Sequence, residues 1–249
     1  KGELRSHCPV NYGLEAFGMQ LALMAEPNIG SRRSIWEQYD HTILTNTVVG
    51  PGGDAAVLRV KGTPLGVVTA IDCNSRYCAI DPYNGARLAV AEAARNVACA
   101  GGRPLGITNC LNMGNPEQEP GSWHLQESVR GIADACRGLD IPVVSGNVSL
   151  YNETDGVPIQ PTPMIGCVGV VDDVVRAVRS PWREGDVLLG VIPGEPSLGG
   201  SEWVAARRGR TAGSLPEVDL ALEARVHTFA RERALDDAVR VVHDISQGG

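Results

Sequence analysis

The sequence predicts an α+β protein built from two units. Runs of β-forming residues at 45–49, 55–60 and 65–71 precede two helical stretches, one that begins near Pro82 and is closed by Gly101–Gly102 and one at 123–139. A Gly-flanked apolar run at 185–192 predicts a buried strand that opens a second, α/β unit. Because a chain of 249 residues can bury one large core or two smaller ones, we expect two structural units.

Charge restricts the partners of the chain. Its 29 acidic and 22 basic residues give a formal net charge of -7. Nucleic-acid binding requires clustered Lys and Arg, so the composition argues against it. A nucleotide ligand stays open, because Mg²⁺ can link carboxylates to phosphates.

The number of cysteines and the hydropathy of the sequence indicate the cellular compartment of the protein. Seven scattered cysteines predict buried thiols in a reducing environment rather than a disulfide or zinc framework. No apolar run approaches the roughly 20 residues of a membrane span, and the N-terminal residues lack a signal-peptide pattern. We therefore expect a cytoplasmic protein that does not contact membranes.

The first 175 residues form a lead-in and the first unit. Residues 1–34 read as a lead-in segment with a short amphipathic helix, and residues 35–175 as a sheet domain. A hairpin is expected between 55–60 and 65–71. Asp54 stands just before the first of these strands and Asp72 at the end of the second. Two such carboxylates can converge on a cation, although each is also typical of an ordinary turn.

The most informative stretch is 81–116, which begins with a turn and a helix. Pro82 suits the first turn of this helix, and Gly101–Gly102 close it. Glu92, Arg95 and Asn96 are spaced so that a carboxylate, a guanidinium and an amide share one face. This arrangement can hold a metal ion and a phosphate together.

A second polar segment follows a short buried strand predicted at 141–144. It contains Gly146, Asn147 and Ser149. A glycine among small polar residues after a β run can form a backbone cradle for phosphate, Asn147 can offer a carbonyl oxygen to Mg²⁺, and Ser149 can offer a hydroxyl. Taken alone, the pattern is more typical of an ordinary polar loop.

Residues 176–249 form the expected second unit, entered through a connection at 180–182. Ser201 is a plausible helix cap, and 218–235 has helical periodicity. Asp244 follows an apolar run and precedes Gly248–Gly249, where a strand would deliver a carboxylate to a Gly-rich loop. The lone histidines, His41, His124 and His227, are more typical of surface or interface positions than of ligands.

Several common catalytic patterns are absent from the sequence. There is no GxxxxGK[ST] loop, no GxGxxG after a strand, no GxSxG and no HExxH. The chemistry must then depend on carboxylates, amides and glycine loops, which favours metal-assisted phosphoryl transfer.

Five motifs in order resemble the phosphoribosylformylglycinamidine synthase family. They are VVGPGGDAAVLRV, DPYNGARLAVAEAARNVACAGGRPLGITNCLNMGNPE, VVSGNVSLYNET, LGGSEW and HDISQGG. From residue 35 to 249 the chain is similar to the second, C-terminal half of the synthetase subunit. The resemblance implies an aminoimidazole ribonucleotide (AIR) synthetase-like fold. In that fold an antiparallel-sheet domain at 35–175 is half of a central barrel, and an incomplete α/β domain follows at 176–249.

The resemblance also implies a function. The family is a C–N ligase that uses ATP, Mg²⁺ and ammonia from glutamine to convert formylglycinamide ribonucleotide into the amidine in purine biosynthesis. The partners implied are the first half of the same synthetase chain, a glutaminase subunit and a small accessory subunit. The nucleophile and general-base positions belong to that first half, so no catalytic acid or base is expected here, and this portion alone is expected to be inactive.

Matched position by position, the resemblance implies two sets of site residues. Asn109 and Gly146 correspond to ATP contacts, Asn147 to a Mg²⁺ ligand and Ser149 to a substrate contact; the family usually has Asp where Asn109 stands. A second, pseudo-symmetric nucleotide site takes Asp54, Glu92, Asn96 and Asp244 as metal ligands, with Ser246 on the nucleotide. Asp72 and Arg95 correspond to functional positions of the other half and are expected to be relics.

Two other interpretations stay open. This half could be a structural scaffold that binds a nucleotide without turning it over. It could also come from another ATP-using enzyme of the AIR synthetase superfamily.

Overall fold

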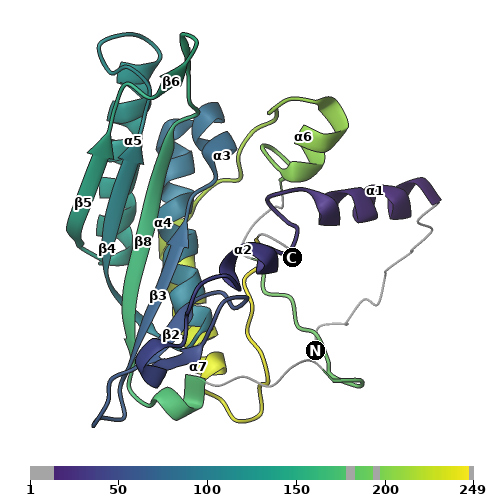
Figure 1. Cartoon of the computed structure of the whole chain (residues 1–249), viewed down its shortest axis with the longest axis vertical. Helices are drawn as coiled ribbons and strands as arrows, with labels where there is room; N and C mark the ends of the chain where they lie inside the picture. The colour runs from purple at the N-terminus through teal and green to yellow at the C-terminus, as the bar shows by residue number, and fades with distance from the viewer. Residues whose placement is uncertain (1–13, 178–182, 193–196, 247–249) are drawn as a thin grey trace.

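The computed structural model describes residues 14–177, 183–192 and 197–246, and its main feature is a six-stranded mixed sheet with helices on one face (Figure 1). The strands of this sheet are β1 (Thr47–Val49), β2 (Ala56–Arg59), β3 (Gly66–Asp72), β4 (Arg103–Asn112), β5 (Val143–Ser149) and β8 (Thr162–Val171). The helices are α1 (Leu14–Ala25), α2 (Arg33–Trp36), α3 (Ser75–Ile80), α4 (Pro82–Cys99), α5 (Gly121–Leu139), α6 (Glu202–Arg208) and α7 (Leu220–Ala234), with the 3₁₀ turns η1 (Ile43–Thr45) and η2 (Val174–Ala177). A separate two-stranded ribbon joins β6 (Glu153–Thr154) and β7 (Val157–Pro158).

The strand order is β1-β2-β3-β8-β4-β5. Neighbours are antiparallel except β4 and β5, which run parallel. The hairpin expected from the sequence forms between β2 and β3, with Ala56 opposite Thr69 and Arg59 opposite Gly66. The predicted α+β class is confirmed.

Helix α4 is the central element of the core. The Asp81 side chain caps it by accepting from the backbone N–H of Asn84 at 3.0 Å, and Pro82 takes the first helical position. Its many alanines let neighbours approach closely. At Gly131 of α5 a Cβ atom would lie 2.2 Å from the backbone oxygen of Tyr83, so this helix crossing requires glycine.

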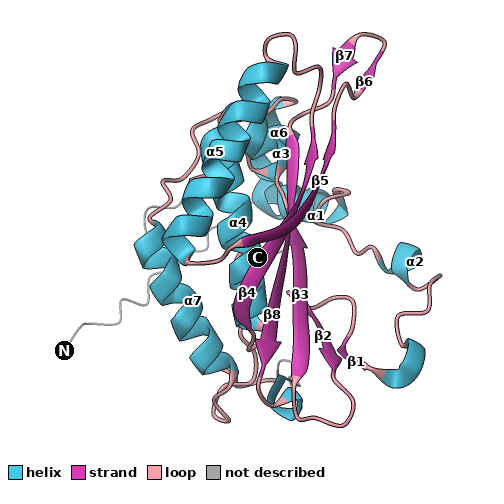
Figure 2. Cartoon of the chain, turned by 90° about the vertical axis from the view of Figure 1, so that its left-hand side faces the viewer, coloured by secondary structure: helices cyan, strands magenta, loops and turns pink. Residues whose placement is uncertain are grey.

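Figure 2 shows α4, α5 and α7 on the same side of the sheet. Side chains alternate along β3 and β8, so that Val68 and Ile165, both fully buried, face α4. On the opposite face, Ile71 is 70% exposed, and Met164 and Val168 are also exposed. The sheet therefore has one covered face and one uncovered apolar face.

The C-terminal helices dock onto this layer. Ser201 caps α6 as predicted, accepting from the backbone N–H of Val204 at 3.2 Å. Arg76 of α3 pairs with Glu202 at the start of α6. Helix α7 packs against α4 through a small cluster that includes Cys99 and Ala230.

Two strand predictions were wrong. Residues 141–144 were expected to form a short buried strand, but β5 begins at Val143, and Val144 is 69% exposed because β5 is an edge strand with one neighbour. Residues 185–192 were expected to form a buried strand, but they form no strand, and Leu189 is 84% exposed. No described strand pairs with this run, and an apolar β run is stable only when a neighbour supplies its hydrogen bonds.

Some predictions fall on residues outside the described ranges. These include the start of the lead-in segment at 1–13, the connection at 180–182 and Gly248–Gly249. The domain boundary near residue 175 stays a prediction. Within the described ranges, none of the helices is long and apolar enough to cross a membrane.

Candidate functional site

Three polar side chains meet where β3 ends beneath α4. Asp72 is the last residue of β3, and Glu92 and Asn96 lie four residues apart on α4. The Asn96 Nδ2 donates to Asp72 Oδ2 at 3.2 Å, and the two residues are 7% and 8% exposed. The helix face predicted from the sequence therefore exists, and it meets Asp72.

The carboxyl groups of this site strongly affect each other. Burial and the negative charge of Glu92 raise the pKa of Asp72 to about 9. Burial also raises the pKa of Glu92, with repulsion from Asp244 adding to the shift and Arg95 opposing it. The Asp72–Glu92 pair therefore retains a proton near neutral pH. Such a pair is stabilised by a cation that replaces the proton.

Arg95 supplies a positive charge within the site. Its Nε donates to Asp244 Oδ1 at 2.7 Å, and its Nη1 donates to Glu223 Oε2 at 2.9 Å. Burial favours the neutral guanidine, but Asp244 and Glu223 outweigh it and raise the pKa of Arg95 above its ordinary value. This ion pair holds the C-terminal stretch against α4.

Asp54 joins the same region through His243. The His243 Nδ1 lies 2.6 Å from Asp54 Oδ1. Burial raises the pKa of Asp54, and the neighbouring His243 acts in the opposite direction. This contact connects Asp54, two residues before β2, to His243, the neighbour of Asp244. Ser246 also reaches the site, because its hydrogen bond to Glu92 contributes to the pKa of that carboxyl group.

Asp54, Asp72, Glu92 and Asp244 form an acidic cluster. Two of its carboxylate oxygens lack a hydrogen-bond partner among the described residues. They are Asp72 Oδ1 and Asp244 Oδ2, and both are buried. An unpaired buried oxygen costs free energy, and carboxylate and amide oxygens are the ligands that Mg²⁺ prefers. Across the described ranges, no three Asp, Glu, His or Cys side chains already form a group that could hold a metal. The residues therefore suit a cation that shares its coordination with phosphate and water, rather than a closed protein cage.

The second predicted set lies on the parallel strands β4 and β5. Asn109 is aligned with Gly146, and Cys110 with Asn147. A Cβ atom at Gly146 would lie 2.4 Å from Asn109 Oδ1, so the absence of a side chain at Gly146 makes room for that amide. The polar segment expected as a loop is a strand, because backbone pairing with β4 extends to Ser149.

Strand alternation divides this second set between the two faces of the sheet. Asn109 is aligned with the fully buried Ile165, which places its side chain on the helix-covered face. Asn147 lies on the opposite face, where its Nδ2 is 3.6 Å from Cys110 Sγ. Ser149 shares that face by alternation, and its Oγ donates to Asn152 Oδ1 at 3.2 Å. The four residues do not converge within the described chain.

A row of cross-strand residue pairs connects the two predicted sets of site residues. Asp72 pairs with Ile165, Ile165 with Asn109, and Asn109 with Gly146. Neighbouring strands are about 4.8 Å apart, so Asp72 and Asn109 are separated by two strand spacings on the same face. The core side chain of Ile165 lies between them.

Sequence reasoning missed Glu223. This residue lies in the first turn of α7 and binds Arg95, which is 128 positions earlier in the chain. The only local signal was its spacing of four from His227, whose Nε2 lies 3.3 Å from Glu223 Oε2. Burial acts to raise the pKa of Glu223, but the hydrogen bond from His227 and the charge of Arg95 outweigh it and lower that pKa.

Comparison with known sequences gives a consistent set of relatives. Residues 52–171 match the family model described as AIR synthase related protein, N-terminal domain. The chain is 53% identical over 238 residues to phosphoribosylformylglycinamidine synthase subunit PurL of Thermomicrobium roseum, covering 94% of this chain and 32% of the relative. The corresponding subunit of Alkaliphilus metalliredigens is 46% identical over 228 residues, covering 91% and 31%. The chain thus spans about a third of the length of the curated relatives it matches.

Solved structures agree with this result. PurL of Thermotoga maritima complexed with ATP superposes with a TM-score of 0.55 at 37% identity, over 61% of this chain and 25% of that chain. The structure of PurLQS from the same organism gives a TM-score of 0.58 at 38% identity, also over 61% and 25%. These likenesses confirm the AIR synthetase-like α+β fold predicted from the sequence.

Proposed function

We propose that the chain is one portion of an ATP-dependent ligase of purine biosynthesis, because residues 52–171 match the AIR synthase related N-terminal domain and the chain matches part of phosphoribosylformylglycinamidine synthase subunit PurL. The whole protein would join ammonia, derived from glutamine, to formylglycinamide ribonucleotide and release the amidine, ADP and phosphate. The observation that most supports this is an identity of 45–53% to three PurL subunits over 91–97% of this chain. We assign this portion to its C-terminal half.

The acidic cluster between β3 and α4 is our proposed magnesium–nucleotide site. Asp54, Glu92, Asn96 and Asp244 would hold Mg²⁺, and Ser246 would contact the nucleotide. The unpaired oxygen of Asp244 and the proton shared by Asp72 and Glu92 support a cation at this place. Bound Mg²⁺ would neutralise phosphate oxygens. Asp72 and Arg95 would balance charge in the site rather than take part in chemistry.

The strands β4 and β5 are our proposed contribution to the catalytic site. Asn109 and Gly146 would contact ATP, Asn147 would bind Mg²⁺, and Ser149 would bind the substrate. These four residues lie on two different faces of the sheet, which supports the proposal that another part of the protein completes the site. Asn109 stands where the family usually has Asp, so it could accept a hydrogen bond but would add no negative charge.

The uncovered apolar face of the sheet supports the proposal that another protein surface packs against it. Ile71, Met164 and Val168 are exposed there, and apolar patches of this kind favour burial against another surface. We propose that the first half of the same synthetase chain pairs with this face to close a barrel. The relatives are named as subunits, which supports a glutaminase subunit and a small accessory subunit as further partners in the cytoplasm.

A structural role for the bound nucleotide is the second candidate function. It is favoured by the ion pair between Arg95 and Asp244, because a buried, well-ordered contact suits retention of a ligand more than repeated turnover. In this case the acidic cluster would keep its nucleotide while chemistry proceeds at β4 and β5.

Turnover by the intact protein tests this assignment. Asn147→Ala should lower kcat by about 10²-fold, the loss expected when one group stabilising developing charge is removed. It should leave the unfolding midpoint unchanged, because Asn147 is exposed. Ser145→Ala, on the same face of β5, is the matched control and should keep full turnover. An Asn147→Ala protein with wild-type kcat would refute the catalytic assignment of this face.

A further inference from the structure

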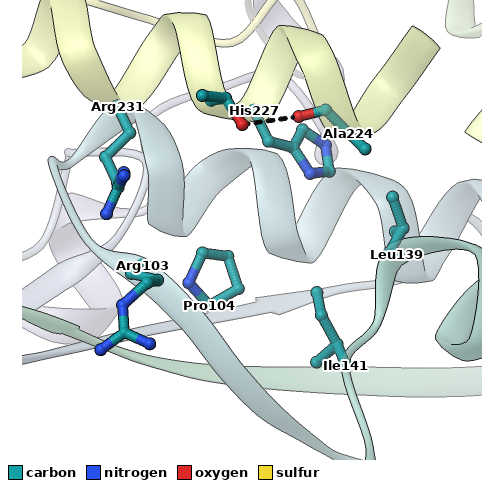
Figure 3. Close-up of a pocket in the computed structure, with 8 residues that line it drawn as sticks. Arg103, Pro104, Leu139, Ile141, Ala224, His227 and Arg231 are labelled. Atoms are coloured by element: carbon teal, nitrogen blue, oxygen red, sulfur yellow. Dashed lines mark hydrogen bonds between the residues drawn. The ribbon is translucent and has the colours of Figure 1, made fainter. Parts of the chain in front are cut away.

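A cavity outside both proposed sites has its own charge pattern. It has a volume of about 230 Å³ and lies beneath α7, facing the start of β4 and the end of α5 (Figure 3). Typical ligand pockets measure roughly 300–1,000 Å³, so this cavity suits a molecule smaller than a nucleotide.

Two arginines give the cavity a positive rim. Arg103, the first residue of β4, and Arg231 of α7 both line it, and Figure 3 shows both side chains bordering the same space. Within the described part of the chain neither guanidinium is in a salt bridge, and no acidic residue lines the cavity. Two guanidinium groups without acidic partners form a site for an anion.

His227 adds a buried polar group to the same space. Its side chain is 8% exposed, and its Nε2 lies 3.3 Å from Glu223 Oε2, which also accepts from Arg95. The contact with Glu223 holds the imidazole ring in the wall of the cavity. The sequence placed His227 at the surface or at an interface; the surface alternative is wrong, because the residue is buried.

The remaining wall is apolar. Pro104, Leu139 and Ile141 line the side of the cavity opposite α7, as Figure 3 shows. A simple inorganic ion would leave this wall in contact with water. A ligand with an apolar body would cover it while its charged end met the arginines.

We propose that this cavity binds a small organic oxyanion, either a carboxylate or a phosphate monoester carried on an apolar body. The oxyanion lies between Arg103 and Arg231, where guanidinium groups can bind it through paired N–H donors. The apolar body rests on Leu139 and Ile141. Binding here requires neither ATP nor Mg²⁺.

Calorimetric titration of the intact protein with benzoate and with phenyl phosphate tests the proposal. Excess magnesium and ADP are present throughout, so that any nucleotide site is filled. At least one probe should bind with one-to-one stoichiometry, whereas the uncharged benzamide and phenol should not bind. Tighter binding of benzoate identifies a carboxylate site, and tighter binding of phenyl phosphate identifies a phosphate-ester site.

Variants decide whether binding occurs in this cavity. Arg103→Gln combined with Arg231→Gln should raise Kd by at least tenfold, because each charge-assisted hydrogen bond contributes enough for about a tenfold change. Arg225→Gln, an exposed arginine on the same helix, is the control and should leave Kd unchanged. Failure of both probes to bind would overturn the proposal, as would an unchanged Kd in the double variant.

Discussion

The Nε of Arg95 lies 2.7 Å from Oδ1 of Asp244, and both side chains are largely buried. A guanidinium therefore balances a carboxylate at the place where a metal ion is proposed. The second oxygen of Asp244 has no partner in the described chain, so the carboxylate can hold Arg95 and still offer a ligand atom. This relationship makes the acidic cluster stable without a cation and able to accept one.

Removing the guanidinium of Arg95 should lower the stability of the folded protein. Arg95→Gln leaves Asp244 and Glu223 buried without their cation, and breaking a buried ion pair in this way typically costs about 3–5 kcal/mol. Urea unfolding of the intact protein should show this loss in the absence of magnesium. Arg225→Gln, an exposed change, should stay within about 0.5 kcal/mol of wild type. Equal stability of the Arg95 and Arg225 variants would argue that the ion pair contributes nothing.

Stability of the metal-free protein should decrease as pH rises from about 4 to 9. The pKa of Asp72 is near 3.8 when unfolded and about 9 when folded, so the folded state holds the extra proton in this range. One such proton gives a slope of at most about 1.4 kcal/mol per pH unit in the free energy of unfolding.

Asp72→Asn should flatten this slope, because the amide does not titrate. Magnesium should stabilise the wild-type protein more at pH 8 than at pH 6, since the metal replaces the shared proton. A wild-type slope that survives in Asp72→Asn would assign the pH dependence to other groups.

Adding a methyl group at Gly146 should act on Asn109. The new Cβ would meet Asn109 Oδ1 at 2.4 Å and force that amide to move. Because the contact is with the end of a side chain, Gly146→Ala should cost only about 1 kcal/mol of stability, at the low end for overpacking. The KM for ATP should rise several-fold. Gly190→Ala, which has no atom within 4 Å of the new Cβ, is the control, and a KM equal to its value would separate Asn109 from ATP binding.

His243 should retain the C-terminal stretch near β2. Its Nδ1 is 2.6 Å from Asp54 Oδ1, which joins residues 189 positions apart. His243→Ala should increase amide hydrogen exchange at residues 240–246, because the carboxylate loses this partner. His41→Ala, at another exposed histidine, should leave exchange there unchanged. Unaltered exchange in the His243 variant would show that Arg95 alone holds this segment.

The elements predicted with most success were those with strong local signals. Pro82, the alanines that follow and Gly101–Gly102 predicted α4, and the helix appears at Pro82–Cys99. The spacing of Glu92 and Asn96 predicted a shared polar face, which contains the hydrogen bond to Asp72. Local spacing was sufficient because both residues belong to one helix.

The features that were missed depend on distant parts of the chain. Glu223 reaches Arg95 only because α7 packs on α4, and no pattern around Glu223 indicates this. A buried strand at 185–192 was predicted from the apolar character of the run, but a strand also needs a partner, which the sequence of the run does not specify. The placement of Asn109 and Asn147 on opposite faces follows from sheet register, which is set by pairing rather than composition.

Magnesium-dependent binding of ADP tests the central claim most directly. Calorimetric titration would compare the wild-type intact protein with Glu92→Gln combined with Asp244→Asn, and with the exposed control Asp155→Asn. The proposed site predicts that the double variant raises Kd by at least tenfold with magnesium present, and that the difference from wild type disappears when EDTA removes the metal. A folded double variant that binds magnesium and ADP as tightly as wild type would contradict it.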